Sequence, residues 1–222
     1  MMRWIKQRIK RSVRTLDSQV AYRLWADGYR PSPHNALMMI EQQAMIELMP
    51  ILHGQVVLDL ACGTGRWGMY AKEQRAKAVV GMDNSYAMLK QSVLENRLVG
   101  DFGVLPFENA YFDVILCGLA IGHLPPERMQ RAIQEMGRVL RQGGVVLMSD
   151  LHPFQALSGA QRTFQGSDGK MYAVEHYVHG YADYHRVARA AGLRIADVRE
   201  PYHSDPKMRK MPIVLVLRLE KL

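Results

Sequence analysis

The chain has few cysteines and lacks a long hydrophobic run. Cys62 and Cys117 are the two cysteines among 222 residues, and they lie far apart in the sequence. Two such residues make neither a disulfide framework nor a cysteine-rich metal site. No apolar stretch approaches the roughly 18 residues that a bilayer-spanning helix needs, and the start lacks the apolar core and cleavage site of a signal peptide. We therefore expect a cytoplasmic protein in a reducing compartment.

Repeats, low-complexity tracts and long linkers are also missing, so nothing in the sequence marks a second domain. With 48% hydrophobic and 23% charged residues, the chain can bury one sizeable core. The formal net charge of +8 gathers at the two ends, with eight basic against two acidic side chains in residues 1–30 and five against one in residues 207–222. An anionic partner is therefore expected at the ends rather than in a basic central groove.

The first residues form the most basic segment of the chain. Residues 3–14 hold six Arg and Lys side chains and no acid, while apolar residues recur at helical spacing from Ile5 to Leu16. This pattern predicts a short basic amphipathic helix, which can lie on an anionic membrane surface or meet an acidic protein or RNA. The alternative is a solvated or frayed terminal helix without a partner.

Beyond this segment, helical and strand-like patterns alternate along the chain. The helices expected from apolar periodicity cover residues 18–29, 36–52, 66 onward, 85–96, 126–141 and 181–192. The strands expected from short apolar runs cover residues 56–60, 78–83, 112–116, 144–149, 193–198 and 213–219, with a short one ending near 100–101. We divide the chain into a basic segment and cap over residues 1–53 and a main domain over residues 54–222, which together form one structural unit.

Apolar strands that alternate with helices are typical of a parallel sheet covered on both faces and joined by right-handed crossovers. The last two predicted strands lie close together in the sequence, as an antiparallel pair at a sheet edge would. The predicted fold is therefore α/β. It is a Rossmann-like, doubly wound, seven-stranded and mostly parallel sheet with an antiparallel edge strand and an N-terminal helical cap.

In such a sheet, ligands bind beyond the carboxyl ends of the strands. The first strand of the main domain is followed by a turn with Gly63 and Gly65, which admits a ligand close to the backbone. Asp83 ends the second strand, where an acid accepts hydrogen bonds from both hydroxyls of a ribose. These features favour an adenosine-containing cofactor. Because Gly63, Gly65 and Gly68 also satisfy the G-x-G-x-x-G pattern of dinucleotide sites, the pattern alone leaves NAD open.

The sequence around this glycine turn resembles motif I of class I S-adenosylmethionine-dependent methyltransferases, in which an acid at the strand end precedes G-x-G. Here that stretch is residues 57–65, with Asp59 as the acid. Further matches to the family follow in the same order at residues 81–83, 100–101, 112–115 and 138–144. The resemblance covers about residues 20–220 of the chain.

The resemblance implies S-adenosylmethionine as the cofactor and a place for thirteen residues around it. They are Asp59, Ala61, Gly63 and Gly65 at the methionine part, Asp83 at the ribose, Asp101, Phe102, Met82 and Met88 at the adenine, Cys117 and Gly118 near the sulfonium, and Tyr22 and Tyr29 at the methionine carboxylate. The alternative for the two methionines is that they only fill the core. The alternative for the two tyrosines is that they only pack, with each hydroxyl hydrogen-bonded inside the protein.

Residues 22–29 resemble the aromatic N-terminal helix of small-molecule methyltransferases, namely the quinone C-methyltransferase and malonyl carrier-protein O-methyltransferase group. The chain departs from that group with Arg30, where an acid is frequent, and with Gln142, where proline is usual. The resemblance implies a small-molecule acceptor, with O-methylation of a hydroxyl or carboxylate favoured over C-methylation of a quinone. An acidic carrier protein or an anionic membrane surface would suit residues 1–16 as a partner. A non-catalytic binding or assembly factor is the alternative of another class.

Methyl transfer from a sulfonium is an in-line displacement, so a base is needed only when the acceptor must lose a proton. His123 and His152 each follow a predicted strand at the ligand-binding edge, and either is a candidate general base, with Asp150 as an orienting partner. A loop histidine bonded to backbone is the alternative for each. The residues expected at the acceptor are Arg162, His176, His179 and Tyr181.

Two other chemistries are disfavoured by the sequence. The spacing of His176, His179 and His185 matches no strong metal signature, so we expect no metal. The N-P-P-aromatic motif of DNA amino-methyltransferases is absent after the fourth predicted strand, and Cys117 lacks the flanking residues of a cytosine-attacking thiolate. Nucleic acid is therefore not the expected substrate.

Overall fold

The computed structural model describes residues 13–203, 205 and 210–222. The basic helix expected over residues 3–14 lies almost wholly outside the described residues. Where the description begins, Arg14–Leu16 form strand β1 instead of the end of a helix. This strand pairs in parallel with β8 (Met171–Val174), and the side chain of Leu16 is buried beneath the pair. A pairing between segments so distant in the sequence leaves no local signal, so the sequence did not predict this strand.

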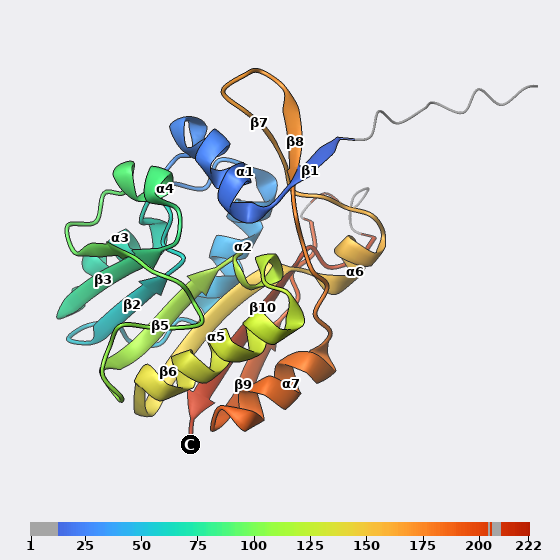
Figure 1. Ribbon diagram of the computed structural model, residues 1–222. Coiled ribbons are helices and arrows are strands. Elements are labelled where there is room, and N and C mark those ends of the chain that lie inside the picture. The colour runs from blue at the N-terminus through green and yellow to red at the C-terminus, as the bar shows by residue number, and fades with distance from the viewer. Residues whose placement is uncertain (1–12, 204, 206–209) are drawn as a thin grey trace, which may run out of the picture.

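The elements alternate along the chain much as the sequence predicts (Figure 1). The remaining helices are α1 (Ser18–Trp25), α2 (Ala36–Glu47), α3 (Arg66–Glu73), α4 (Tyr86–Lys90), α5 (Pro126–Val139), α6 (Pro153–Leu157) and α7 (Tyr181–Ala190), with short 3-10 turns η1 (Ala26–Gly28) and η2 (Ile121–His123). The remaining strands are β2 (Val56–Leu60), β3 (Ala78–Asp83), β4 (Arg97–Val99), β5 (Phe112–Gly118), β6 (Leu140–Leu151), β7 (Thr163–Gln165), β9 (Leu193–Arg199) and β10 (Val214–Lys221).

Seven of these strands form the main sheet, in the order β4-β3-β2-β5-β6-β10-β9. The strands from β4 to β6 pair in parallel, while β10 runs antiparallel to both β6 and β9. The order reverses between β2 and β5, so the carboxyl ends of these two central strands flank the crevice where this kind of sheet binds ligands. The predicted fold class is therefore confirmed, with β10 as the antiparallel strand and β9 at the edge.

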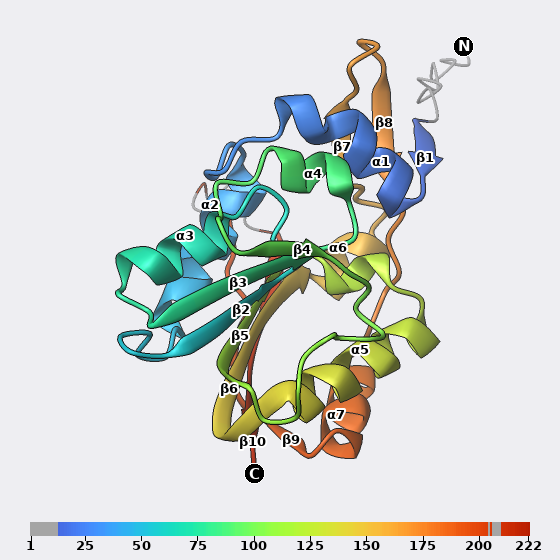
Figure 2. The same ribbon diagram turned by 60° about the vertical axis from the view of Figure 1, so that its left-hand side comes forward.

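Helices cover both faces of the main sheet (Figures 1 and 2). On one face α5 and α7 bury apolar side chains such as Met129, Ile133 and Val187 against the sheet. On the other face α2 and α3 do the same through Met45 and Trp67. Because α2 belongs to the predicted cap and packs directly on the main sheet, the two segments divided at residue 53 share one core.

The helix expected over residues 85–96 is shorter in the structure, where α4 ends at Lys90. The chain then turns inward, and the Leu94 side chain is buried against three glycines. Helical periodicity continued through this stretch, but burial of Leu94 requires the backbone to leave the helix. The helix expected over 36–52 likewise ends at Glu47.

The less regular segment, residues 151–180, supplies part of the cap. It contains α6 and the antiparallel hairpin β7–β8, which forms a small sheet with β1 in the order β1-β8-β7. This small sheet lies beside α1 above the main sheet, and α1 also contacts α4 (Figure 2). The cap is therefore built from helix α1 and a three-stranded sheet, not from helices alone.

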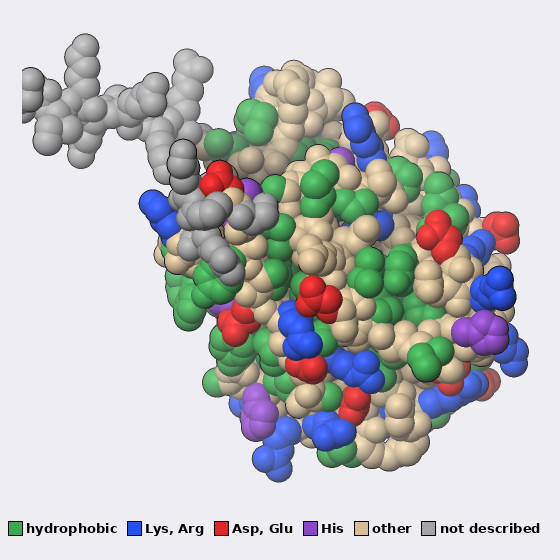
Figure 3. Space-filling view, turned by 180° about the vertical axis from the view of Figure 1, so that it is seen from behind, with side chains coloured by type: hydrophobic (Ala, Val, Ile, Leu, Met, Phe, Trp, Pro, Cys, Tyr) green, Lys and Arg blue, Asp and Glu red, His purple; other side chains and the backbone are tan. Residues whose placement is uncertain are grey.

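The surface shows no field of one charge sign on the face turned away in Figure 1. Lys and Arg side chains lie there among Asp and Glu side chains (Figure 3). Among the residues that the structure describes, no helix is long and apolar enough to span a membrane.

Candidate active site

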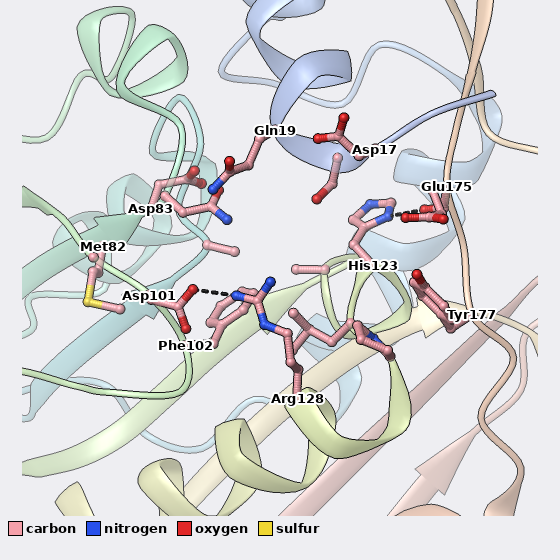
Figure 4. A pocket seen from close by; sticks show the side chains of 17 residues that line it. Asp17, Gln19, Met82, Asp83, Asp101, Phe102, His123, Arg128, Glu175 and Tyr177 are labelled. Carbon is pink, nitrogen blue, oxygen red and sulfur yellow. Dashed lines mark hydrogen bonds and ion pairs between the residues drawn. The ribbon is translucent and has the colours of Figure 1, made fainter. Parts of the chain in front are cut away.

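A cavity of about 320 Å³ opens at the carboxyl ends of β2, β3 and β5, beneath α1 (Figure 4). It lies where the topology places the ligand crevice. The residues that line it are Asp17, Ser18, Gln19, Ala61, Met82, Asp83, Asn84, Gly100, Asp101, Phe102, Ala120, His123, Leu124, Pro125, Arg128, Glu175 and Tyr177. Residues from the carboxyl ends of the strands, from α5 and from the cap thus surround one space, as a site for an elongated ligand requires.

The Asp83 carboxylate holds the glycine turn in place. One oxygen accepts a hydrogen bond from the Gly63 N–H at 2.8 Å, and the other accepts from the Ser85 N–H at 2.7 Å. Burial raises the pKa of Asp83 above its ordinary value. Each carboxylate oxygen has a second lone pair. Because Asp83 also lines the cavity, these lone pairs suit two neighbouring hydroxyls of a sugar.

The glycine turn itself needs backbone conformations that favour glycine. Gly63 and Gly65 have φ values of 52° and 92°, in the left-handed region. Ala61, at the end of β2, also has a positive φ of 57° and lines the cavity. Gly63 and Gly65 themselves are not among the residues that line the cavity, so their role at the methionine part of the cofactor stays a prediction.

The third glycine of the G-x-G-x-x-G pattern serves packing. A Cβ at Gly68 would lie 2.7 Å from the Leu94 side chain, and the Asp59 carboxylate accepts the Gly68 N–H at 2.7 Å. Asp59 is buried, and this burial raises its pKa to about 7. A carboxylate and a leucine therefore occupy the start of α3, which is the position that binds a pyrophosphate in a dinucleotide site. In a dinucleotide site the third glycine also serves close packing, so the cofactor has to be distinguished by other features.

The far end of the cavity is lined by Met82, Asp101 and Phe102, the residues expected near an adenine. Asp101 forms an ion pair with Arg128 from α5 and accepts the Gly103 N–H at 2.8 Å (Figure 4). Met82 packs its sulfur against Gly100. Met88 is buried behind Gly63 and is not among the lining residues, so it supports the turn from within.

Cys117 and Gly118 do not reach the cavity, although they were expected near the sulfonium. Cys117 is buried in the core, and burial raises the pKa of its thiol. A Cβ at Gly118 would lie 2.5 Å from the Trp67 ring nitrogen, so Gly118 faces α3. Side chains alternate along a strand and the chain bends after Gly118, which leaves Ala120 as the lining residue.

His123 lines the cavity but is tightly bonded. Its Nδ1 lies 2.7 Å from the Glu175 carbonyl oxygen, which fixes the proton on Nδ1. Its Nε2 lies 3.1 Å from the Tyr22 hydroxyl and 3.0 Å from Nη1 of Arg162. Burial and the Arg162 guanidinium lower the pKa of His123 to about 3. A general base needs a free lone pair, so this geometry argues against that role for His123.

Arg162 joins His123 to an aromatic cluster in the cap. Its Nη1 also donates to the Leu119 carbonyl at 2.7 Å. Rings of the cluster contact one another in the order Tyr22, Tyr29 and Trp25, and Phe164 stacks on Trp25. Burial raises the pKa of both tyrosines, so they stay protonated. Arg162 is 8% exposed, and no carboxylate of the described residues lies within ion-pair distance of it.

His152 and Tyr181 lie away from the cavity. His152 caps α6 by accepting the Phe154 N–H, and its Nε2 donates to Glu200 at 2.9 Å. Tyr181 also donates to Glu200. The expected roles of His152 as a base and Tyr181 at the acceptor therefore do not fit the structure. Strand β6 continues to Leu151, and His152 therefore lies beyond the ligand-binding edge of the sheet.

The two other histidines predicted at the acceptor lie behind η2. His179 donates to the Leu124 carbonyl at 2.9 Å. The His176 ring and the Asp150 carboxylate both crowd Gly122, where a Cβ would lie within 2.6 Å of each. Asp150, the expected orienting partner, is buried with its pKa raised to about 7 and accepts from Tyr184. Across the described ranges, no group of three or more His, Cys, Asp or Glu is arranged to hold a metal ion.

Sequence reasoning missed the residues that frame the site. Glu41 in α2 is fully buried and binds Arg66 at 2.7 Å and the Ser149 hydroxyl at 2.7 Å. A lone acid in an apolar helix is a signal that could have found it. Glu175 and Tyr177 line the cavity from the segment directly after β8, the strand that pairs with β1, and no local pattern reveals that pairing.

Comparison with known proteins gives this geometry a family context. Residues 57–144 match the family model described as Methyltransferase domain. Malonyl-[acyl-carrier protein] O-methyltransferase of Pectobacterium atrosepticum is 31% identical over 134 residues, covering 54% of this chain and 52% of that protein. Demethylmenaquinone methyltransferase of Staphylococcus aureus is 36% identical over 108 residues, covering 45% of this chain and 44% of that protein. This chain thus spans about half the length of these curated relatives.

Solved structures show the same fold. The S-adenosylmethionine-dependent methyltransferase from Mesorhizobium loti superposes with a TM-score of 0.69 at 19% identity, over 82% of this chain and 98% of that one. The family match and the relatives confirm the resemblance to class I S-adenosylmethionine-dependent methyltransferases, and the structural likeness confirms the fold. S-adenosylmethionine, the cofactor expected from the sequence, agrees with these matches.

Proposed function

We propose that this chain binds S-adenosylmethionine and transfers its methyl group to an oxygen of a small acceptor, with a carboxylate as the favoured group. The observation that carries the proposal is the cavity at the carboxyl ends of β2, β3 and β5, with Asp83 at its centre and Asp101 at its far end. When bound, the cofactor supplies a methyl group on a cationic sulfur. The residues of the chain have to bind both reactants, align them and exclude water.

The charge of the cavity supports a cationic cofactor over NAD. Four carboxylates line it, Asp17, Asp83, Asp101 and Glu175, and Arg128 is their counter-charge. An anionic pyrophosphate would be repelled by this arrangement, whereas a sulfonium and an ammonium group would be attracted. The first turn of α3 also favours the cationic cofactor, because the Asp59 carboxylate already accepts the Gly68 N–H there.

Arg162 supports an anionic acceptor. A buried guanidinium without a carboxylate partner is costly, since its charge has lost its hydration. Its Nη1 is used by Leu119 and His123, and the guanidinium also bonds the Tyr22 side chain, so part of its five-donor set remains for a ligand. The fork of an Arg side chain matches a carboxylate in a bidentate manner. We therefore assign Arg162, together with Tyr22 and Tyr29, to the acceptor side of the site, although none of the three is among the residues that line the cavity.

A carboxylate acceptor also suits the state of His123. A carboxylic acid is ionised at neutral pH, so its oxygen attacks without the help of a base. A phenol, an alcohol or a ring carbon must lose a proton during the reaction. The lone pair of His123 already faces two donors, Tyr22 and Arg162, so it offers no such help.

The acceptor class can be tested by where the methyl group goes. The purified chain would be incubated with methyl-tritiated S-adenosylmethionine and a panel of carboxylic acids, free and carrier-bound, and of quinols. Treatment with base releases a methyl ester as volatile methanol, whereas methyl groups on carbon or on an ether oxygen stay in the product. Volatile label supports the proposed carboxylate acceptor. Base-stable label on a ring carbon of a quinol favours the alternative, which a relative named demethylmenaquinone methyltransferase represents, whereas base-stable label on an ether oxygen contradicts the carboxylate alone. Binding without any transfer favours a non-catalytic factor.

We propose an acidic carrier protein as the partner of the basic N-terminal segment, in line with a relative named malonyl-[acyl-carrier protein] O-methyltransferase. The test should remove residues 1–12 and keep Arg14–Leu16, because that strand pairs with β8. Deletion should weaken association with an acidic carrier protein, measured by calorimetry at low salt. Unchanged association would refute this role, and lost binding to anionic vesicles alone would assign the segment to a membrane surface.

A further inference from the structure

One imidazole joins four segments of the chain above the cavity. His123 in η2 contacts Tyr22 in α1, the Glu175 carbonyl after β8, and Arg162 ahead of β7. Arg162 in turn donates to the carbonyl of Leu119, directly after β5. These segments are distant in the sequence, and three of them carry residues that line the cavity: α1, η2 and the segment after β8.

The bonds of His123 require one tautomer. The Glu175 carbonyl accepts a hydrogen bond, so Nδ1 carries the proton, and Nε2 presents its lone pair to the Tyr22 hydroxyl and the Arg162 guanidinium. A second proton on Nε2 would point a donor at the Arg162 guanidinium, which can only donate. The neutral ring is therefore the form that fits, and a role in accepting a proton would break the contacts that hold the walls together.

Both walls held by His123 contribute to the cavity mouth. On one side, α1 places Ser18 and Gln19 over the cavity. On the other side, the chain after β8 places Glu175 and Tyr177 there, and the Tyr177 N–H donates to the Gly122 carbonyl at 2.7 Å. Figure 4 shows the His123 ring between Glu175 and the space beneath α1, with its dashed bond directed at the Glu175 backbone.

We infer that His123 is a positioning residue that fixes the cap over the cofactor site and sets the direction of Arg162. This inference deepens the proposed function and rests on it. The imidazole acts through Tyr22, Glu175 and Arg162, and it takes no proton from the acceptor. Loss of the ring should loosen α1 and the segment after β8, which lowers affinity for the cofactor because the walls must then be ordered on binding.

Two amide variants separate the two sides of the ring. In His123→Asn the amide nitrogen reaches the place of Nδ1 and donates to Glu175, but nothing meets Tyr22 and Arg162. In His123→Gln the amide oxygen reaches the place of Nε2 and accepts from Tyr22 and Arg162, but the bond to Glu175 is lost. His123→Phe keeps the ring volume and loses both bonds. His152→Asn is the matched control, because His152 is also a buried histidine but lies away from the cavity.

The first readout is amide hydrogen exchange without any cofactor. His123→Phe should raise exchange in residues 18–25 and 172–177, His123→Gln should restore protection in the first range, and His123→Asn in the second. A general loss of stability would raise exchange in all three variants and in the control alike. That uniform result would overturn the inference whether or not the proposed function is right.

The second readout is calorimetric affinity for S-adenosylhomocysteine. His123→Phe should weaken it about tenfold, with smaller losses for the two amide variants and none for His152→Asn. If the wild type does not bind S-adenosylhomocysteine, the proposed function fails and the exchange pattern alone decides on His123. With an acceptor in hand, a loss confined to kcat, together with disappearance in the variants of a wild-type limb of the pH profile near pH 6–7, would identify a general base and overturn the inference.

Discussion

Replacement of Asp83 by Ala should affect both stability and cofactor affinity, because one carboxylate serves two purposes. It accepts the N–H groups of Gly63 at 2.8 Å and Ser85 at 2.7 Å, and it also lines the cavity. The bonds to the two N–H groups link the glycine turn to the start of α4. Without the carboxylate, both N–H groups lose a charged acceptor in a half-buried place.

The size of each effect follows from these contacts. A hydrogen bond to a charged group contributes about 1.5–3 kcal/mol, and part of that is recovered when water reaches the turn. We therefore expect Asp83→Ala to lower the free energy of unfolding by about 2–4 kcal/mol. Loss of the bonds to the ribose hydroxyls should weaken binding of S-adenosylhomocysteine by about 1–3 kcal/mol, which is about 5- to 150-fold in Kd.

The chain offers a matched control at the opposite edge of the sheet. Asp113 accepts the Val56 N–H at 2.7 Å and pairs with Arg141 at 2.7 Å, so Asp113→Ala also removes a carboxylate from a strand N–H. It should lower stability without changing cofactor affinity, since Asp113 is not among the residues that line the cavity. Unfolding by urea and calorimetric titration below the unfolding temperature provide the two readouts. Wild-type affinity in folded Asp83→Ala, or an equal loss in Asp113→Ala, would refute the reasoning.

Three further predictions follow from the same geometry. Arg162→Gln should lower kcat/KM for a carboxylate acceptor about 10- to 100-fold while S-adenosylhomocysteine affinity stays within about threefold, and an equal loss of both would contradict the acceptor role. Burial raises the pKa of Asp59 from 3.8 to about 7, so the folded state binds the extra proton and stability falls as pH rises from about 4 to 7. Asp59→Asn should flatten that slope in urea unfolding curves, and an unchanged slope would count against this assignment. Leu94→Ala should lower the free energy of unfolding by about 2–5 kcal/mol and relieve the strain of Gly68→Ala, so purely additive losses would exclude the packing argument.

Much of the fold could be predicted because it depends on local patterns. The apolar runs that became β2, β3, β5 and β6 have no amphipathic alternation, and this is what a sheet covered on both faces imposes. The failures occur where distant contacts overrule the local signal. Helix α4 stops at Lys90 because Leu94 packs on Gly65, Gly68 and Gly81, and β1 forms because β8 is available to pair with it.

The residues of the site likewise fall into those that local patterns predict and those that distant contacts decide. Asp83 and Asp101 could be found from their spacing after a glycine turn, because strand ends fix where such acids lie. His123 and His152 could not be distinguished, since both follow strands at one edge. Only the structure shows that His152 turns toward Glu200 and α6, while His123 faces Tyr22 above the cavity.

The central claim is that the cavity binds S-adenosylmethionine and not a dinucleotide. Parallel calorimetric titrations of the purified full chain with S-adenosylmethionine, S-adenosylhomocysteine and NAD test it most directly. The acidic lining and the carboxylate of Asp59 at the start of α3 predict binding of the first two ligands and no binding of NAD. Binding of NAD alone, or of none of the three, would contradict the account.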